Sequence, residues 1–136
     1  MPHVHRLAVR VRYPEADPMG RLHHSVYLVY FEMGRTEYLR ERGLAYAEME
    51  RRGRFVAIAA VDLKCRAPAY YDQQVTVETQ VLEVRGARVV FGNRAVRSDG
   101  GRETVLAEAT ITGALVDASG RPQRFTAEET RLLLGP

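Results

Sequence analysis

Hydrophobic and polar residues alternate along much of this chain, and a period of two is typical of β-strands with one exposed face. Between Val4 and Tyr13, leucine and valine side chains alternate with arginines. The sequence predicts four further strands, over residues 55–66, 75–84, 88–97 and 104–117. The strand at 55–66 begins with a fully apolar run, which predicts a central strand that is covered on both faces.

A different period, of three and four residues, follows the first predicted strand and indicates a helix of about 18 residues. Its apolar stripe consists of Tyr27, Tyr30, Phe31, Gly34 and Tyr38. We expect Ser25 to cap the N-terminus and Gly43 to adopt a left-handed conformation at the C-terminus. Gly34 on the stripe predicts a close approach between the helix and a sheet. Shorter helical segments are predicted at 44–52 and 126–134.

The order of one strand, one long helix and four more strands predicts an α+β fold with a largely antiparallel sheet. A helix of this length can cover one face of the sheet. The other face and both edges then remain uncovered, so we expect a homo-oligomer, either a dimer or a tetramer. The sequence contains no repeat and no linker, and we interpret residues 1–136 as a single domain.

The composition narrows the class of protein. The chain has 136 residues, of which 46% are hydrophobic and 27% charged, and these values exclude a wholly disordered chain. Its longest apolar run, Phe55 to Val61, is far shorter than the ~18 residues of a membrane-spanning helix. The N-terminal segment is charged where a signal peptide is apolar, so we expect a cytoplasmic protein with no membrane partner. The lone cysteine, Cys65, allows no internal disulfide.

The basic residues are almost all arginines, since Lys64 is the only lysine among 20 Lys and Arg side chains. Arginine pairs with carboxylates and phosphates in a bidentate geometry, so this bias fits nucleic acid, a phosphorylated small molecule or a salt-bridged surface. A nucleic-acid-binding module would interleave aromatic and basic residues or present a recognition helix. Here the aromatic residues lie on the apolar stripe, and we expect no nucleic-acid partner.

The loop before the long helix carries the strongest candidate for chemistry, Asp17. Pro18 restricts the backbone of Asp17, and Gly20 permits a positive φ, so the loop is constrained. It places the carboxylate close to a helix N-terminus, which offers unpaired N–H groups and a partial positive charge. A carboxylate beside such amides suits acyl transfer. The alternative, which turn statistics alone favour, is that Asp17 only stabilises its own turn.

This region resembles the hotdog-fold acyl-CoA thioesterases of the 4-hydroxybenzoyl-CoA thioesterase-like family. The residues that match the family motif are Tyr13, Glu15, Asp17, Gly20, His24, Tyr27, Phe31-Glu32 and Arg35-Thr36-Glu37, and Leu106 to Ala109 match farther on. The chain departs from common members of the family at Ala16, at Arg21-Leu22 and at His23. These departures bear on the acyl group more than on the reaction.

The resemblance implies a hotdog fold, in which a curved antiparallel sheet of five strands wraps a long central helix, and assembly into dimers or tetramers. It implies hydrolysis of an acyl-CoA thioester to a free acid and coenzyme A, without a metal or a cofactor. Asp17 would then be the nucleophile or the general base, two roles that the sequence does not separate. The backbone N–H of His24, next to Ser25, would bind the thioester oxygen.

Several side chains are secondary candidates. The His24 ring could orient the carboxylate or contact the thioester, or it could simply be a helix-start histidine. The candidates for substrate binding are Tyr13, Lys64, Arg66 and Arg88. The three basic ones could meet the phosphates of coenzyme A, although a solvated surface is the plainer interpretation of each. Glu32 is a weak candidate, either facing a partner's active site or forming an ion pair with Arg35.

Other observations favour a plain interpretation. Cys65 lies between Lys64 and Arg66, which could lower its pKa, but we expect a packed strand residue. Tyr27 is interpreted as a core residue. The histidine pairs lack a further ligand at metal-binding spacing, so we expect no metal. Two alternative functions remain, a non-catalytic acyl-CoA-binding hotdog protein and a hotdog hydratase or dehydratase. The second is disfavoured because the long helix has no internal histidine.

Overall fold

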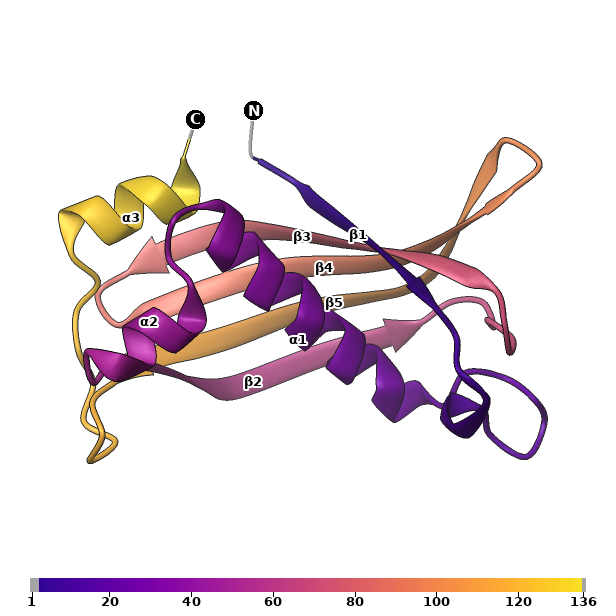
Figure 1. Cartoon of the computed structure of the whole chain (residues 1–136), viewed down its shortest axis with the longest axis horizontal. Coiled ribbons are helices and arrows are strands. Elements are labelled where there is room, and N and C mark those ends of the chain that lie inside the picture. Colours follow the sequence, from indigo (N-terminus) through magenta and orange to yellow (C-terminus); the bar gives the residue numbers. More distant parts are fainter. Residues whose placement is uncertain (1–2, 136) are drawn as a thin grey trace.

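The computed structural model describes residues 3–135, and its five strands form one antiparallel sheet in the order β1-β3-β4-β5-β2 (Figure 1). The strands are β1 (His5–Arg10), β2 (Phe55–Cys65), β3 (Gln74–Arg85), β4 (Arg88–Asp99) and β5 (Arg102–Val116). The predicted α+β class and the five-stranded antiparallel sheet are therefore confirmed. Loop residues Tyr13–Glu15 form a short 3-10 helix, η1.

The long helix α1 (His24–Glu41) has 18 residues and lies across one face of the sheet (Figure 1). All five residues of the predicted apolar stripe are buried. A Cβ atom at Gly34 would collide with the hydroxyl of Thr79 on β3, so only glycine lets the helix come this close to the sheet. The hydrophobic core lies between α1 and the sheet.

The two ends of α1 differ in how well the sequence predicted them. Gly43 has φ +80 and follows the helix end, as expected. The N-cap is His23 rather than Ser25, which corrects the prediction. The backbone of His23 is extended, and its Nδ1 accepts the Ser25 N–H at 3.2 Å. A ring nitrogen at the right distance thus takes the place of the hydroxyl that is usual at this position.

Two short helices, α2 (Tyr46–Arg51) and α3 (Ala127–Leu134), lie at the end of the sheet away from the Asp17 loop (Figure 1). Thr126 caps α3, because its hydroxyl accepts the Glu129 N–H at 3.0 Å. Glu129 in turn accepts two guanidinium hydrogen bonds from Arg54, which precedes β2. This ion pair fixes the C-terminal helix to the start of β2.

The prediction that residues 55–66 form a central strand is wrong. Within residues 3–135, β2 pairs only with β5 and forms one edge of the sheet, and its residues 57–62 are all exposed. An apolar run predicts burial but not which element supplies the cover. The pairing register of β2 also shifts between Ile58 and Ala60, which explains why the alternation appears only in the second half of the strand.

Candidate active site

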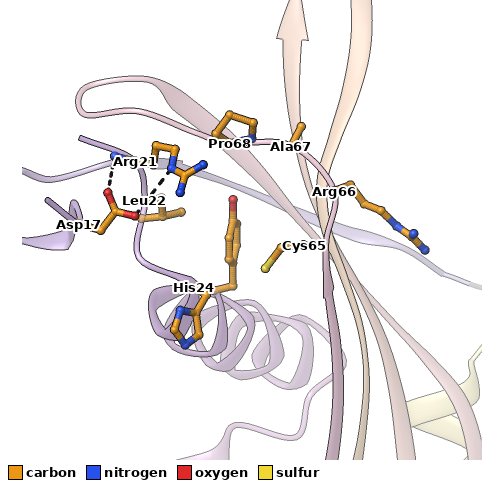
Figure 2. A pocket seen from close by; sticks show the side chains of 9 residues that line it. Asp17, Arg21, Leu22, His24, Cys65, Arg66, Ala67 and Pro68 are labelled. Atoms are coloured by element: carbon orange, nitrogen blue, oxygen red, sulfur yellow. Dashed lines mark hydrogen bonds and ion pairs between the residues drawn. The ribbon is translucent and has the colours of Figure 1, made fainter. Parts of the chain in front are cut away.

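Asp17 is held in a tight turn by main-chain hydrogen bonds. Its Oδ1 accepts the N–H of Arg21 at 3.0 Å (Figure 2). It also accepts the N–H of Met19 at 2.8 Å, while the Asp17 N–H donates to the Arg21 carbonyl at 2.6 Å. Gly20 has φ +77, as the turn requires. The loop is therefore constrained as predicted, and one carboxylate oxygen is fully used by the turn.

The second carboxylate oxygen, Oδ2, is much less occupied. Among the residues that the structure describes, none forms a hydrogen bond with Oδ2, and its one ion-pair partner is the Arg21 Nε at 3.8 Å. The Asp17 side chain keeps 18% of its surface exposed, and it lines a cavity of about 280 Å³. Oδ2 thus remains available to a ligand after the turn has formed.

The same turn occurs a second time in the molecule, at Asp117. The segments Asp17–Arg21 and Asp117–Arg121 share the pattern Asp-x-x-Gly-Arg. The Asp117 Oδ1 also accepts two main-chain N–H groups, from Ser119 at 2.8 Å and Arg121 at 3.0 Å, and Gly120 has φ +82. The turn is therefore a structural unit by itself. Only its surroundings can distinguish an aspartate of a functional site from one that merely stabilises the turn.

The cavity lies between three segments of the chain, namely the Asp17 loop, the start of α1, and the end of β2 with the residues after it (Figure 2). It is lined by Asp17, Arg21, Leu22, His24, Tyr27, Cys65, Arg66, Ala67 and Pro68. The Leu22 N–H donates to the Ala69 carbonyl at 2.7 Å. Because this hydrogen bond joins the loop to the opposite wall, the cavity has a rigid frame.

The N-terminus of α1 presents an unused donor to this cavity. Within residues 3–135 no acceptor meets the His24 N–H, as is usual for the first amide of a helix. The Ser25 N–H, by contrast, donates to His23 Nδ1. Of the two amides that the sequence proposes for the thioester oxygen, the structure leaves the one of His24 available.

The His24 ring is placed differently from its backbone. It is exposed, stacks on the His23 ring with a centroid distance of 4.4 Å, and points away from Asp17 (Figure 2). The structure brings the His24 main chain toward the Asp17 cavity, whereas a role of the imidazole in orienting the carboxylate stays a prediction.

The electrostatics of the cavity keep Asp17 ionised and Tyr27 neutral. The pKa of Asp17 is lowered, mainly by the hydrogen bond from the Arg21 N–H. Partial burial opposes this effect, while the Met19 N–H and the Arg21 charge add to it. Burial raises the pKa of Tyr27 to about 12, with a smaller contribution from Cys65 and an opposing one from Arg97. At neutral pH the cavity therefore holds one carboxylate and one phenol that keeps its proton.

The remaining candidates for substrate binding are dispersed. Arg66 lines the cavity and pairs with Glu108 at 3.1 Å. Lys64 pairs with Asp62 at 3.5 Å and lines a separate shallow cavity beside Arg66. Arg88 lies opposite Ala114 on β5, whereas Cys65 lies opposite Ala107. Seven strand residues separate these positions, roughly 23 Å at 3.3 Å per residue, so Arg88 is remote from this cavity.

Tyr13 and Glu32 also lie outside the Asp17 cavity. Tyr13 is 78% exposed, and its ring meets the edge of Tyr71 at 5.4 Å. Glu32 is exposed and lines another cavity together with Arg35. Among the described residues, Glu32 forms no ion pair within 4 Å, so a single chain forms no surface ion pair between Glu32 and Arg35. Of the predicted site residues, only Asp17, His24 and Arg66 line the Asp17 cavity.

Sequence reasoning assigned two residues of the cavity, Cys65 and Tyr27, only a packing role. Cys65 was expected to be packed but is exposed, and it lines the wall opposite the loop. Tyr27 is buried as predicted, yet it also lines the cavity. No pattern in the sequence reveals either fact, because both depend on where the end of β2 lies relative to α1.

The structure offers no sign of a metal centre in residues 3–135, where no three His, Cys, Asp or Glu side chains cluster as metal ligands would. Among the described helices, none combines the length and the hydropathy that crossing a membrane would require.

Comparison with known proteins gives consistent matches. The thioesterase-like superfamily matches residues 11–131. Acyl-CoA thioesterase YbgC of Haemophilus influenzae is 38% identical over 124 residues, which cover 88% of this chain and 87% of that protein. Putative acyl-CoA thioesterase YneP of Bacillus subtilis is 32% identical over 90 residues, which cover 66% of this chain and only 65% of that protein.

A solved structure extends the likeness to the fold. The chain superposes on a mutant of 4-hydroxybenzoyl CoA thioesterase complexed with 4-hydroxybenzoyl CoA with a TM-score of 0.88. The superposition covers 96% of this chain and 98% of that chain at 20% identity. The predicted hotdog fold is thereby confirmed.

Proposed function

Because the chain belongs to the thioesterase-like superfamily, we propose that it hydrolyses an acyl-CoA thioester to a free acid and coenzyme A, with Asp17 as the catalytic carboxylate. The chain is a hotdog-fold thioesterase. One observation supports the assignment of Asp17 above all others. Its available oxygen Oδ2 and the unused N–H of His24 belong to residues that line the same cavity.

The reaction follows from these two groups. The carbonyl oxygen of the thioester accepts the His24 N–H, and the partial positive charge of the helix N-terminus stabilises the negative charge that develops there. Asp17 then acts in one of two ways. It attacks the carbonyl carbon and expels the thiolate, forming an anhydride that water hydrolyses, or it removes a proton from a water molecule that attacks directly. Both routes consume one water and release one acid and one thiol.

The coenzyme A part of the substrate carries phosphates, and arginines are suited to bind them. Arg66 is the best-placed residue, because it lines the cavity and its side chain is about half exposed. Lys64 lies two residues earlier on the same strand and extends this basic edge. Arg88 and Tyr13 could contribute only to a more distant part of the ligand. We further propose a dimer or a tetramer, since the outer edge of β2 is unpaired within residues 3–135.

One observation favours a second function, that of an acyl-CoA-binding protein without catalysis. The Asp17 turn has the same hydrogen bonds as the Asp117 turn, so its carboxylate has a structural role whether or not it acts on a substrate. A binding protein would keep the cavity and its basic edge but would not release a thiol.

A thiol-release assay over short, medium, long and aromatic acyl-CoA substrates tests both functions. We expect turnover by the wild type and a loss of at least ~100-fold in kcat for Asp17→Asn, the low end for removal of a general base. Near-normal turnover by Asp17→Asn would contradict the assignment of Asp17. Tight binding of acyl-CoA without thiol release by the wild type would favour the binding protein.

A further inference from the structure

Tyr27 is the one buried tyrosine of α1 whose hydroxyl no other part of the described chain uses. Tyr30 and Tyr38, on the same stripe, donate to Glu15 Oε1 at 2.7 Å and to the Leu133 carbonyl at 2.6 Å. No residue among 3–135 forms a hydrogen bond with the Tyr27 hydroxyl, although Tyr27 is only 2% exposed. The hydroxyl oxygen is not sealed in the core, since the buried side-chain atoms without a partner do not include it, and its lack of a protein partner requires an explanation.

The location of Tyr27 supplies one. It lines the cavity of Asp17 and His24. It lies three residues, nearly one turn, after His24, and long side chains on a helix lean toward its N-terminus. The ring therefore covers the first turn, where the unused His24 N–H lies. Phe31 lies behind it, with a ring centroid distance of 6.4 Å, so the ring is held in place before any ligand binds.

We propose that the Tyr27 hydroxyl donates a hydrogen bond to the carbonyl oxygen of the bound thioester, alongside the His24 N–H. The site for the developing oxyanion would then have one main-chain donor and one side-chain donor. The inference rests on the proposed thioesterase function and adds a residue to it.

The phenol is suited to this role because it does not exchange its proton. Burial raises the pKa of Tyr27 to about 12, with a lesser contribution from Cys65. At neutral pH the Tyr27 hydroxyl therefore keeps its proton and acts as a hydrogen-bond donor, not as a nucleophile or a base. Since every acyl-CoA carries the same carbonyl, the contribution of Tyr27 is independent of the acyl group.

The substitution Tyr27→Phe removes this one hydroxyl. We expect kcat to fall about 100-fold, the size seen when one oxyanion donor is lost, and to fall equally for all acyl groups. The melting temperature stays unchanged, because the hydroxyl has no partner in the described chain. Tyr38→Phe is the matched control. It breaks a buried hydrogen bond at the other end of α1, so it lowers the melting temperature by about 4 °C and leaves kcat unchanged.

Binding of unreactive analogues gives a readout that does not depend on hydrolysis. A ketone analogue, in which a methylene replaces the sulfur, keeps the carbonyl, and an alkyl thioether of coenzyme A lacks it. We expect Tyr27→Phe to bind the ketone about fivefold more weakly than the wild type, as for one lost hydrogen bond. The thioether binds both proteins equally.

Three results would overturn the inference. The first is equal binding of the ketone by the wild type and Tyr27→Phe. The second is a loss of kcat that is confined to substrates whose acyl group carries a further oxygen. The third is a loss of kcat that only accompanies a loss of stability. A wild type that binds the ketone better than Tyr27→Phe but releases no thiol would contradict the proposed function while leaving the assignment of the hydroxyl intact.

Discussion

The Asp17 loop and the Asp117 loop are two copies of one turn in different surroundings. Each has an aspartate that caps two main-chain N–H groups and a glycine with positive φ. Each is also closed by an isolated bridge between its flanking residues, Ala16 with Leu22 and Val116 with Pro122. Judged by local geometry alone, the two aspartates are equivalent.

They differ in what lies beside the second carboxylate oxygen. Near Asp17 lies a cavity that the unused amide of α1 also adjoins. The Asp117 Oδ2 instead meets the Gln123 side chain at 3.4 Å, in the connection between β5 and α3. The turn therefore positions a carboxylate in both loops, but only the carboxylate of Asp17 lines a cavity beside a helix N-terminus, and the catalytic role that we propose for Asp17 depends on this difference.

The largest expected difference between the two loops is in turnover. Asparagine keeps the Oδ1 acceptor, so Asp17→Asn and Asp117→Asn should both retain the turn and unfold close to the wild-type melting temperature. We expect kcat to fall at least ~100-fold only for Asp17→Asn. Thiol release and thermal unfolding of the two purified variants provide the measurement. Equal turnover by the two variants would mean that the surroundings of Asp17 have no catalytic consequence.

The glycines offer an intermediate effect. Gly20 and Gly120 have φ of +77 and +82, and a Cβ atom at either would meet no atom within 4 Å. The cost of Gly20→Ala or Gly120→Ala is therefore backbone strain, about 1–2 kcal/mol of unfolding free energy in each loop. We expect similar destabilisation in denaturant titrations but a severalfold loss of kcat only for Gly20→Ala, since its carboxylate shifts. A loss of turnover in Gly120→Ala would show that general instability is the cause.

The smallest expected effect concerns pH. The Arg21 N–H, and to a lesser degree the Met19 N–H and the Arg21 charge, hold the pKa of Asp17 below its usual value of 3.8. In the proposed mechanism the ionised form reacts, so the acidic decline of kcat/KM should lie at a lower pH than for an aspartate with the usual pKa. The stability that Asp17 contributes is present above its unfolded pKa and is lost over the same acidic range.

Substitution of the arginines sharpens this test. Arg21→Gln keeps the main-chain N–H but removes the charge 3.8 Å from Oδ2, so the acidic limb of kcat/KM should move upward slightly. Arg121→Gln in the other loop should leave the profile unchanged. Profiles from pH 3 to 7, with circular dichroism to confirm that the protein stays folded, would detect the shift. An unchanged or downward-shifted limb in Arg21→Gln would exclude a contribution of the Arg21 charge.

The sequence by itself determined the features that depend on near neighbours in the chain. The aromatic stripe from Tyr27 to Tyr38 fixed the extent and the buried face of α1, and Gly34 predicted its close approach to the sheet. Pro18 and Gly20 predicted the constrained loop. The family motif around Asp17 and His24 predicted the hotdog fold, which the structure and the comparisons confirm. The helix and the constrained loop follow from periodicity and backbone restriction, which act over a few residues, whereas the hotdog fold was implied by the family resemblance.

Only the tertiary structure decided what depends on distant segments. It made β2 an edge strand, exposed Cys65 to the cavity, and left Arg88 remote from Asp17. It also gave the three tyrosines of the apolar stripe different surroundings. Tyr30 and Tyr38 each donate to an acceptor from a distant segment, whereas the Tyr27 hydroxyl has no such acceptor in the described chain. The same cause separates Asp17 from Asp117. An Asp-x-x-Gly-Arg turn forms from its own backbone, but the helix end and the strand end that complete a site come from elsewhere in the chain.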